Sequence, residues 1–117
     1  MASANLLDLN EIRQLIADMG GDEEMIPDLV DSLELDVNRS IKEMHTAVEM
    51  ADAKRLKQAA HRLKGGCGSL GATLAAALSQ ELESLGQSGE IVGAAPMIER
   101  LEGLCAESIK ALRELSL

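Results

Sequence analysis

The histidine at position 61 stands in a sequence context that suits chemistry at a ring nitrogen. Lys64 follows it one helical turn later, and small residues surround it. Imidazole titrates near neutral pH, so an exposed histidine keeps a neutral nitrogen lone pair in the cell. A lysine one turn away disfavours the imidazolium form and can neutralise the charge of an incoming phosphoryl group. The pattern fits a nucleophilic histidine, and a merely solvated basic helix face is the alternative.

The segment around this histidine is basic, although the chain as a whole is acidic. Residues 51–68 contain five lysines and arginines against one aspartate, a local balance of +4, whereas the whole chain carries a net charge of −9. This contrast predicts that the histidine face meets an anionic group or partner. Nucleic acid is not expected, because phosphate repulsion opposes it and no aromatic residue is present to stack on bases.

Glycine is unusually frequent just after the histidine. Three glycines lie within positions 65–68, and each costs about 0.5–1 kcal/mol relative to alanine inside a helix. Either the helix ends there, or another molecule approaches the backbone closely, and both can hold. Residues three and four apart share a helix face, so one surface strip is predicted. Its members are Lys57, His61, Lys64, Gly65 and Gly68.

Apolar residues recur at helical spacing along almost the whole chain, which predicts an all-α fold. The first helix is expected over residues 8–19, ended by Gly20 and Gly21. Asp22 is expected to begin a long second helix, with an irregular first turn near Pro27. Asp52 is expected to cap the helix that carries the histidine, over about residues 52–68. Two further helices follow, separated by a turn at positions 86–89.

Five helical segments with short connections predict an antiparallel four-helix bundle with the short first helix packed across it. The 117 residues are expected to form one domain, residues 1–117. No apolar run approaches the ~18 residues that cross a bilayer, and no signal peptide follows Met1. We therefore expect a cytoplasmic protein without membrane contact, and its net charge favours a monomer.

The remaining residues that could do chemistry are interpreted as structural. Cys67 and Cys105 are too few for a disulfide framework and are expected to be reduced, partly buried thiols, with a bridge or redox switch as the alternative. His45 lies outside the apolar stripe of its helix and lacks a lysine–glycine context, so an exposed surface residue is expected. No spacing among these residues matches a metal-ligand pattern, so no metal site is predicted.

In three short motifs the chain resembles the histidine-containing phosphotransfer (HPt) family: Ala60-His61, Leu63-Lys64-Gly65 and Gly71-Ala72. Leu82-Glu83-Ser84-Leu85-Gly86 is similar to the family's next helix, and the helix order matches along essentially the whole chain. The resemblance implies that His61 accepts phosphate from a response-regulator receiver aspartate and passes it to another receiver. It also implies that Lys64 steadies the phosphoryl group, and that Gly65 and Gly68 admit the receiver's active site.

The resemblance further implies a phosphotransfer intermediate, not an enzyme with its own kinase or ATP-binding activity. No cofactor is expected on the chain, because the receiver brings the Mg²⁺. The implied partners are receiver domains and a hybrid sensor histidine kinase. The implied docking surface combines apolar residues near the N-terminus with two cations of the basic segment. These residues are Ile12, Ile16, Met25, Lys57 and Arg62.

Two departures from the family pattern leave questions open. Several relatives carry a glutamine near the histidine, whereas the equivalent place here is Glu83, with Gln80 one turn earlier. Either side chain could orient the His61 ring. Relatives often have aromatic residues near the start of the second helix, where this chain has Met25 and Ile26; methionine is an adaptable side chain at binding surfaces. The alternative function is a helical adaptor that binds a receiver or kinase without being phosphorylated; the intact His61 and Lys64 favour the carrier.

Overall fold

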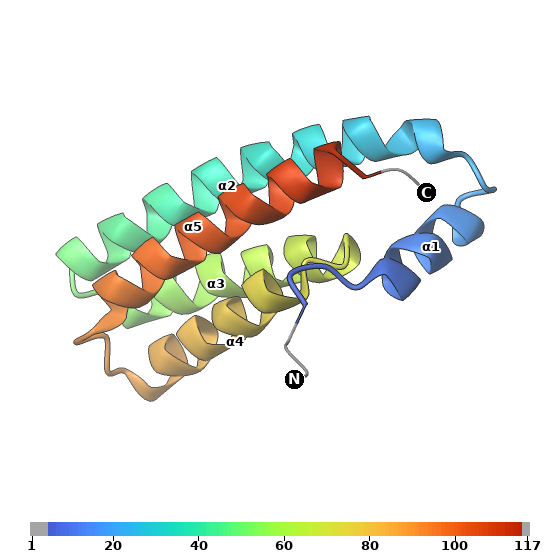
Figure 1. The fold of residues 1–117 in the computed structure, drawn as a ribbon. Coiled ribbons are helices and arrows are strands. Elements are labelled where there is room, and N and C mark those ends of the chain that lie inside the picture. Colours follow the sequence, from blue (N-terminus) through green and yellow to red (C-terminus); the bar gives the residue numbers. More distant parts are fainter. Residues whose placement is uncertain (1–4, 116–117) are drawn as a thin grey trace.

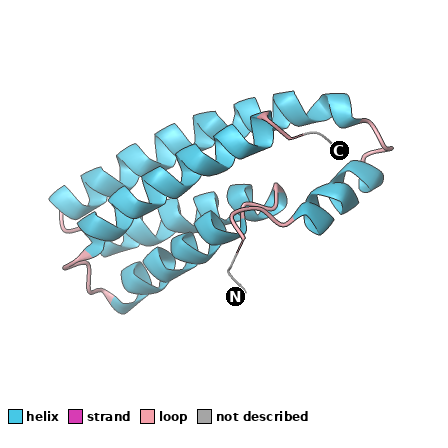
Figure 2. Ribbon diagram, in the orientation of Figure 1, coloured by secondary structure: helices cyan, strands magenta, loops and turns pink. Residues whose placement is uncertain are grey.

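The computed structural model describes residues 5–115, and every regular element in that range is helical (Figure 2). In chain order the elements are α1 (Leu9–Asp18), the short 3₁₀ helix η1 (Glu23–Met25), α2 (Ile26–Glu49), α3 (Ala53–Ser69), α4 (Thr73–Ser88) and α5 (Ala94–Arg113). Helices α2 to α5 form an antiparallel bundle, and α1 lies at one end of it, beside the α3–α4 turn (Figure 1). The predicted all-α fold, a four-helix bundle with an extra N-terminal helix, is confirmed.

Polar caps and glycines set the helix boundaries close to where they are predicted. The Asp52 carboxylate accepts a hydrogen bond from the Arg55 amide at 3.0 Å, so the motif helix runs one residue later at each end than predicted. Asp22 caps η1 instead of α2, and this 3₁₀ turn is the irregular start expected near Pro27. Gly20 has a φ of +97° and stands just after α1, in the left-handed region that glycine adopts without strain.

The core is built from aliphatic side chains on the inward faces of α2 to α5, supplemented by α1. Leu56 and Leu63 of α3 are fully buried and pack in the same cluster as Leu82 of α4 and Leu101 of α5. Burying such a side chain contributes about 1.5–3 kcal/mol. Because this inward stripe fixes the rotation of α3 about its axis, the residues between the stripe positions face outward.

Helices α3 and α4 approach so closely at one point that only glycine fits. A Cβ atom on Gly86 would lie 2.7 Å from the backbone nitrogen of Lys57 and 2.8 Å from the carbonyl oxygen of Ala53. Contacts that short force the backbones apart. Gly86 therefore sets the spacing of the two helices, and with it the position of the side chains one and two turns earlier in α4.

The N-terminal helix is anchored to the α3–α4 turn through Gly71. The Asp8 amide donates to the Gly71 carbonyl oxygen at 2.8 Å. Gly71 has a φ of +69°, and a Cβ atom there would lie 2.9 Å from Ile12 Cγ1. The apolar stripe of α1 is thereby pressed onto the bundle end, where Ile12 is completely buried and Ile16 is 8% exposed.

The two cysteines are buried in the core, and His45 is partly covered. Cys67 and Cys105 are both free and buried, as predicted. Hydrogen bonding to Cys67 and burial together raise the pKa of the Cys105 thiol above its ordinary value. The prediction of an exposed His45 was wrong, because its ring is half-buried in a groove between α2 and α5 that Glu49 and Glu102 also line.

None of the helices within residues 5–115 has the length and hydrophobicity that crossing a bilayer requires.

Candidate functional site

His61 projects from the outer face of α3 beside α4. The residues on either side of it in sequence include members of the buried stripe of α3. Ala60 and Leu63 are fully buried, whereas the His61 side chain is 66% exposed. The ring is nevertheless held in place, because its Nδ1 atom lies 2.9 Å from Oε2 of Glu83 on α4. The Glu83 side chain is only 16% exposed, so an ordered, largely covered carboxylate holds an exposed imidazole.

This contact determines which ring nitrogen faces solvent with a lone pair. A carboxylate can only accept hydrogen bonds, so the Nδ1 atom of a neutral His61 must carry the proton that Glu83 receives. Nε2 then holds the lone pair, and no hydrogen bond to it is found within residues 5–115. The arrangement leaves the lone pair of His61 Nε2 available for a reaction.

Lys64 completes a compact charged group with Glu83. Its Nζ atom lies 2.8 Å from Oε1 of Glu83 and donates a hydrogen bond of 2.9 Å to Oε1 of Gln80. The hydrogen bond from Lys64, and secondly the contact with His61, hold the pKa of the Glu83 carboxyl below its usual value. Glu83 therefore stays charged at neutral pH, and its negative charge is balanced by Lys64.

The sequence left open whether Glu83 or Gln80 contacts the histidine, and in the structure Glu83 makes this contact. Glu83 contacts both His61 and Lys64, whereas Gln80 contacts Lys64, one turn further along α3. At the other side of His61, the backbone of Lys57 packs against Gly86. We call this boundary between α3 and α4 the α3–α4 seam. It comprises Lys57, His61 and Lys64 of α3 and Gln80, Glu83 and Gly86 of α4.

The glycines after His61 lie in regular helix, and two of them face open space. A Cβ atom on Gly65 or on Gly68 would meet no atom within 4 Å, whereas one on Gly66 would lie 3.6 Å from Leu33 of α2. Because α3 continues to Ser69, the glycines do not simply end the helix, although the end is near. Nothing else within the described chain requires glycine at positions 65 and 68.

The predicted docking residues do not all reach the surface. Ile12 and Ile16 pack into the core, so in this structure they are unavailable to a partner, contrary to the expectation that they form part of a docking surface. Their helix turns its apolar stripe onto the bundle end, a direction that periodicity alone does not reveal. Met25 is half-buried at the end of η1, and Arg62 is exposed, with its Nη1 atom 4.0 Å from Oε2 of Glu43.

Lys57 and Arg62 instead lie beside the histidine. Together with Gln58, His61 and Glu83 they line one open cavity. Within residues 5–115, no cluster of three or more histidine, cysteine, aspartate or glutamate side chains could hold a metal ion. The site as it stands offers a ring nitrogen with a free lone pair, a largely covered counter-charge and nearby cations.

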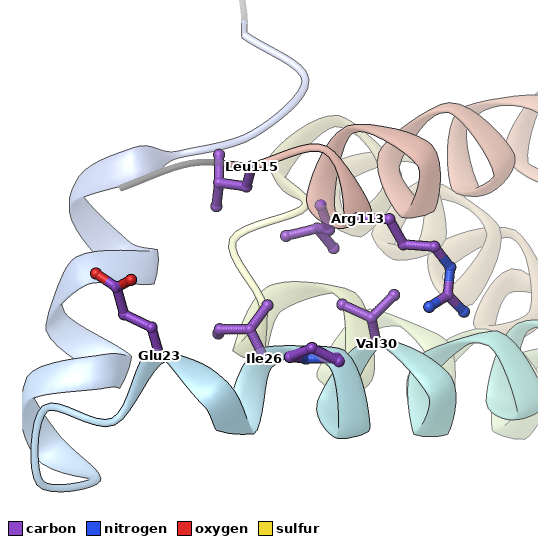
Figure 3. A pocket seen from close by; sticks show the side chains of 7 residues that line it. Glu23, Ile26, Val30, Arg113 and Leu115 are labelled. Atoms are coloured by element: carbon purple, nitrogen blue, oxygen red, sulfur yellow. The ribbon is translucent and has the colours of Figure 1, made fainter.

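A second pocket, of about 270 Å³, lies between the start of α2 and the end of α5 (Figure 3). It is lined mainly by apolar side chains, including Ile26, Val30 and Leu115. The Arg113 guanidinium at its edge is engaged by Asp31 and Glu34 of α2, at 2.9 Å each. The pocket contains no residue of the α3–α4 seam and is separate from the histidine site.

Comparisons with known proteins agree with this geometry. A family model described as the Hpt domain matches residues 23–114. A similar solved structure is the crystal structure of histidine-containing phosphotransfer protein B (HptB) from Pseudomonas aeruginosa PAO1, which is 32% identical, has a TM-score of 0.85, and aligns over 96% of this chain and 95% of that one. A search of curated proteins gave no significant match. The chain belongs to the Hpt domain family of histidine-containing phosphotransfer proteins.

Proposed function

We propose that the protein is a phosphocarrier of a multistep His–Asp phosphorelay. It accepts a phosphoryl group on Nε2 of His61 from a receiver aspartate and passes it to another receiver. The observation that carries this proposal is the 2.9 Å contact between His61 Nδ1 and Glu83, because it leaves the opposite nitrogen as the exposed lone-pair donor.

The transfer step follows from that arrangement. The Nε2 lone pair attacks the phosphorus of the aspartyl phosphate, the N–P bond forms, and the P–O bond to the aspartate breaks to leave a carboxylate. The ring becomes positively charged, because Nδ1 keeps its proton. The charge of Glu83 stabilises this cation, as a preorganised counter-charge does at a developing charge. The protonated ring is also a good leaving group, so the step can run onward to a second receiver.

Lys64 and the open glycines support the same role. The Lys64 ammonium is already ordered by Glu83 and Gln80, so little reorganisation is needed for it to face a phosphoryl group on His61. A receiver must bring its aspartate to the His61 ring, and the bare surface at Gly65 and Gly68 leaves room for it. Phosphoryl transfer relies mainly on such positioning and charge stabilisation.

In this proposal the rest of the machinery belongs to the partners. The receiver supplies the aspartate and the Mg²⁺, a hybrid sensor kinase supplies the phosphate upstream, and the carrier needs no cofactor or ATP site of its own. We place this relay in the cytoplasm. Met25, Lys57 and Arg62 are the docking residues that remain accessible, at least in part.

The proposal is tested by transfer of labelled phosphate from phosphorylated receivers of the same organism. The wild type should acquire an acid-labile, alkali-stable phosphate and return it to an unphosphorylated receiver. His61→Gln should fold and accept none, whereas the matched control His45→Gln should behave as wild type. If the wild type binds receivers without ever acquiring label, the protein is an adaptor.

A further inference from the structure

Lys57 differs from the other polar residues of the α3–α4 seam in having no side chain opposite it. His61 meets Glu83, and Lys64 meets both Glu83 and Gln80, but the backbone of Lys57 packs against Gly86. Its side chain makes no hydrogen bond or ion pair with any part of residues 5–115. The half-buried Lys57 therefore carries an uncompensated positive charge one turn before the histidine.

The charge of Lys64, by contrast, is already balanced. It lies 2.8 Å from the Glu83 carboxylate, and the two charges cancel. A phosphoryl group carries about −1.5 to −2 at neutral pH. The protonated ring of phosphorylated His61 contributes one positive charge, and the Glu83–Lys64 pair is neutral, so about −0.5 to −1 remains uncompensated. A further cation near His61 would therefore stabilise the phosphorylated state.

The geometry brings Lys57 to the same cavity as the histidine ring. Helical side chains point back toward the N-terminus, so the His61 ring covers the turn that contains Lys57 and Gln58. Both residues line one open cavity with His61 and Glu83. The other cation there, Arg62, has its Nη1 atom 4.0 Å from Glu43 Oε2, toward α2.

We propose that Lys57 is the second cation of the site and binds the phosphoryl group once it is on Nε2 of His61. The proposal rests on the proposed function, because it requires phosphate on that nitrogen. It assigns to Lys57 a role in stabilising the phosphohistidine, beyond contact with a partner. Gly86 contributes indirectly, because a larger residue there would force α3 and α4 apart and displace the backbone of Lys57.

The test uses phosphoramidate, a small phosphodonor that needs no receiver, and follows the phosphoryl group by ³¹P NMR during a pH titration. A cation nearby favours the more negative, deprotonated form of the phosphohistidine, so Lys57→Gln should raise the pKa that the ³¹P shift reports. One charge at about 6 Å in water, screened at 0.1 M ionic strength, gives about 0.3 pH unit. Lys57→Arg keeps the charge and should titrate as wild type.

Lys54→Gln is the matched control, because Lys54 is an exposed lysine of the same helix. It lies two turns, about 10 Å, from His61 and outside the cavity, so its removal should shift the pKa by about 0.1 unit. Equal pKa shifts for Lys57→Gln and Lys54→Gln, or no pKa shift for Lys57→Gln, would overturn the proposed role of Lys57. The proposed function would stand in that case, because the wild type would still carry phosphate on His61. A wild type that takes up no phosphate on His61 would overturn both.

Discussion

Replacing Gly65 by alanine should separate the stability of the protein from its ability to meet a partner. A methyl group there meets no atom within 4 Å, so the folded protein accommodates it without strain. Alanine also costs less conformational entropy in a helix, and the gain is about 0.5–1 kcal/mol. We expect Gly65→Ala to be more stable than wild type and slower in transfer with receivers.

The size of both effects can be worked out. At about 2.1 cal/mol/K per residue, the 117-residue chain has an unfolding entropy of about 0.25 kcal/mol/K, so the midpoint of thermal unfolding should rise by about 2–4 °C. The methyl group projects where a receiver's active site must approach. Misplacement of the reacting groups by about 1 Å can cost 100-fold, and we expect kcat/KM with phosphorylated receivers to fall at least 10-fold.

Gly66→Ala is the matched control on the neighbouring residue. Its methyl group would lie 3.6 Å from Leu33 of α2, an ordinary contact away from the His61 strip. It should therefore stabilise the helix to a similar extent and leave transfer unchanged. Phosphoramidate is small enough to reach His61 in either variant, so its rate should stay within about twofold of wild type.

Three results for Gly65→Ala would contradict these expectations. If Gly65→Ala transfers phosphate with receivers as fast as wild type, no partner backbone approaches that surface. If Gly65→Ala lowers the melting temperature, the space around residue 65 is not open in solution. Loss of phosphoramidate reactivity would instead place the defect in the His61 site itself.

Three further predictions concern the seam and the core. Gly86→Ala should destabilise the protein in urea by about 1–3 kcal/mol, because its methyl group meets the Lys57 backbone, whereas Gly103→Ala in open space should not; equal midpoints would refute the close contact. Because the pKa of Glu83 is lowered in the folded state, its stabilising effect is present above its ordinary value of 4.5 and is lost as the pH falls below it. Thermal melts should therefore show a steeper loss in this range for wild type than for Glu83→Gln, and parallel curves would contradict the ion pair. Cys67 and Cys105 should react with a thiol reagent only after denaturation, since both are buried; rapid native reaction would show that the core opens.

Local patterns in the sequence predict the helices well and their mutual register poorly. The spacing of Val30, Leu33 and Val37 marks the inward face of α2, and the Asp52 cap marks the start of α3. These signals act within one turn or one helix, where propensity, capping and periodicity decide the outcome. The outward direction of His61 follows from the same periodicity.

Contacts between helices depend on register, which the one-dimensional pattern does not contain. Whether Glu83 or Gln80 meets His61 is decided by the close packing at Gly86, a contact with residues of a different helix. The burial of Ile12 likewise depends on the contact of α1 with Gly71. An apolar stripe on a short terminal helix is equally consistent with a docking surface and with a core contact.

In the proposed transfer, Glu83 holds Nδ1 of His61 and leaves Nε2 as the phosphoryl acceptor. The most direct measurement is a ¹⁵N–³¹P correlation NMR spectrum of the protein phosphorylated by a receiver, with its imidazole nitrogens labelled. We expect a single phosphohistidine, coupled through Nε2 of His61, with Nδ1 still protonated. Phosphate on Nδ1, or on any other side chain, would show that Glu83 does not select Nε2 as the acceptor.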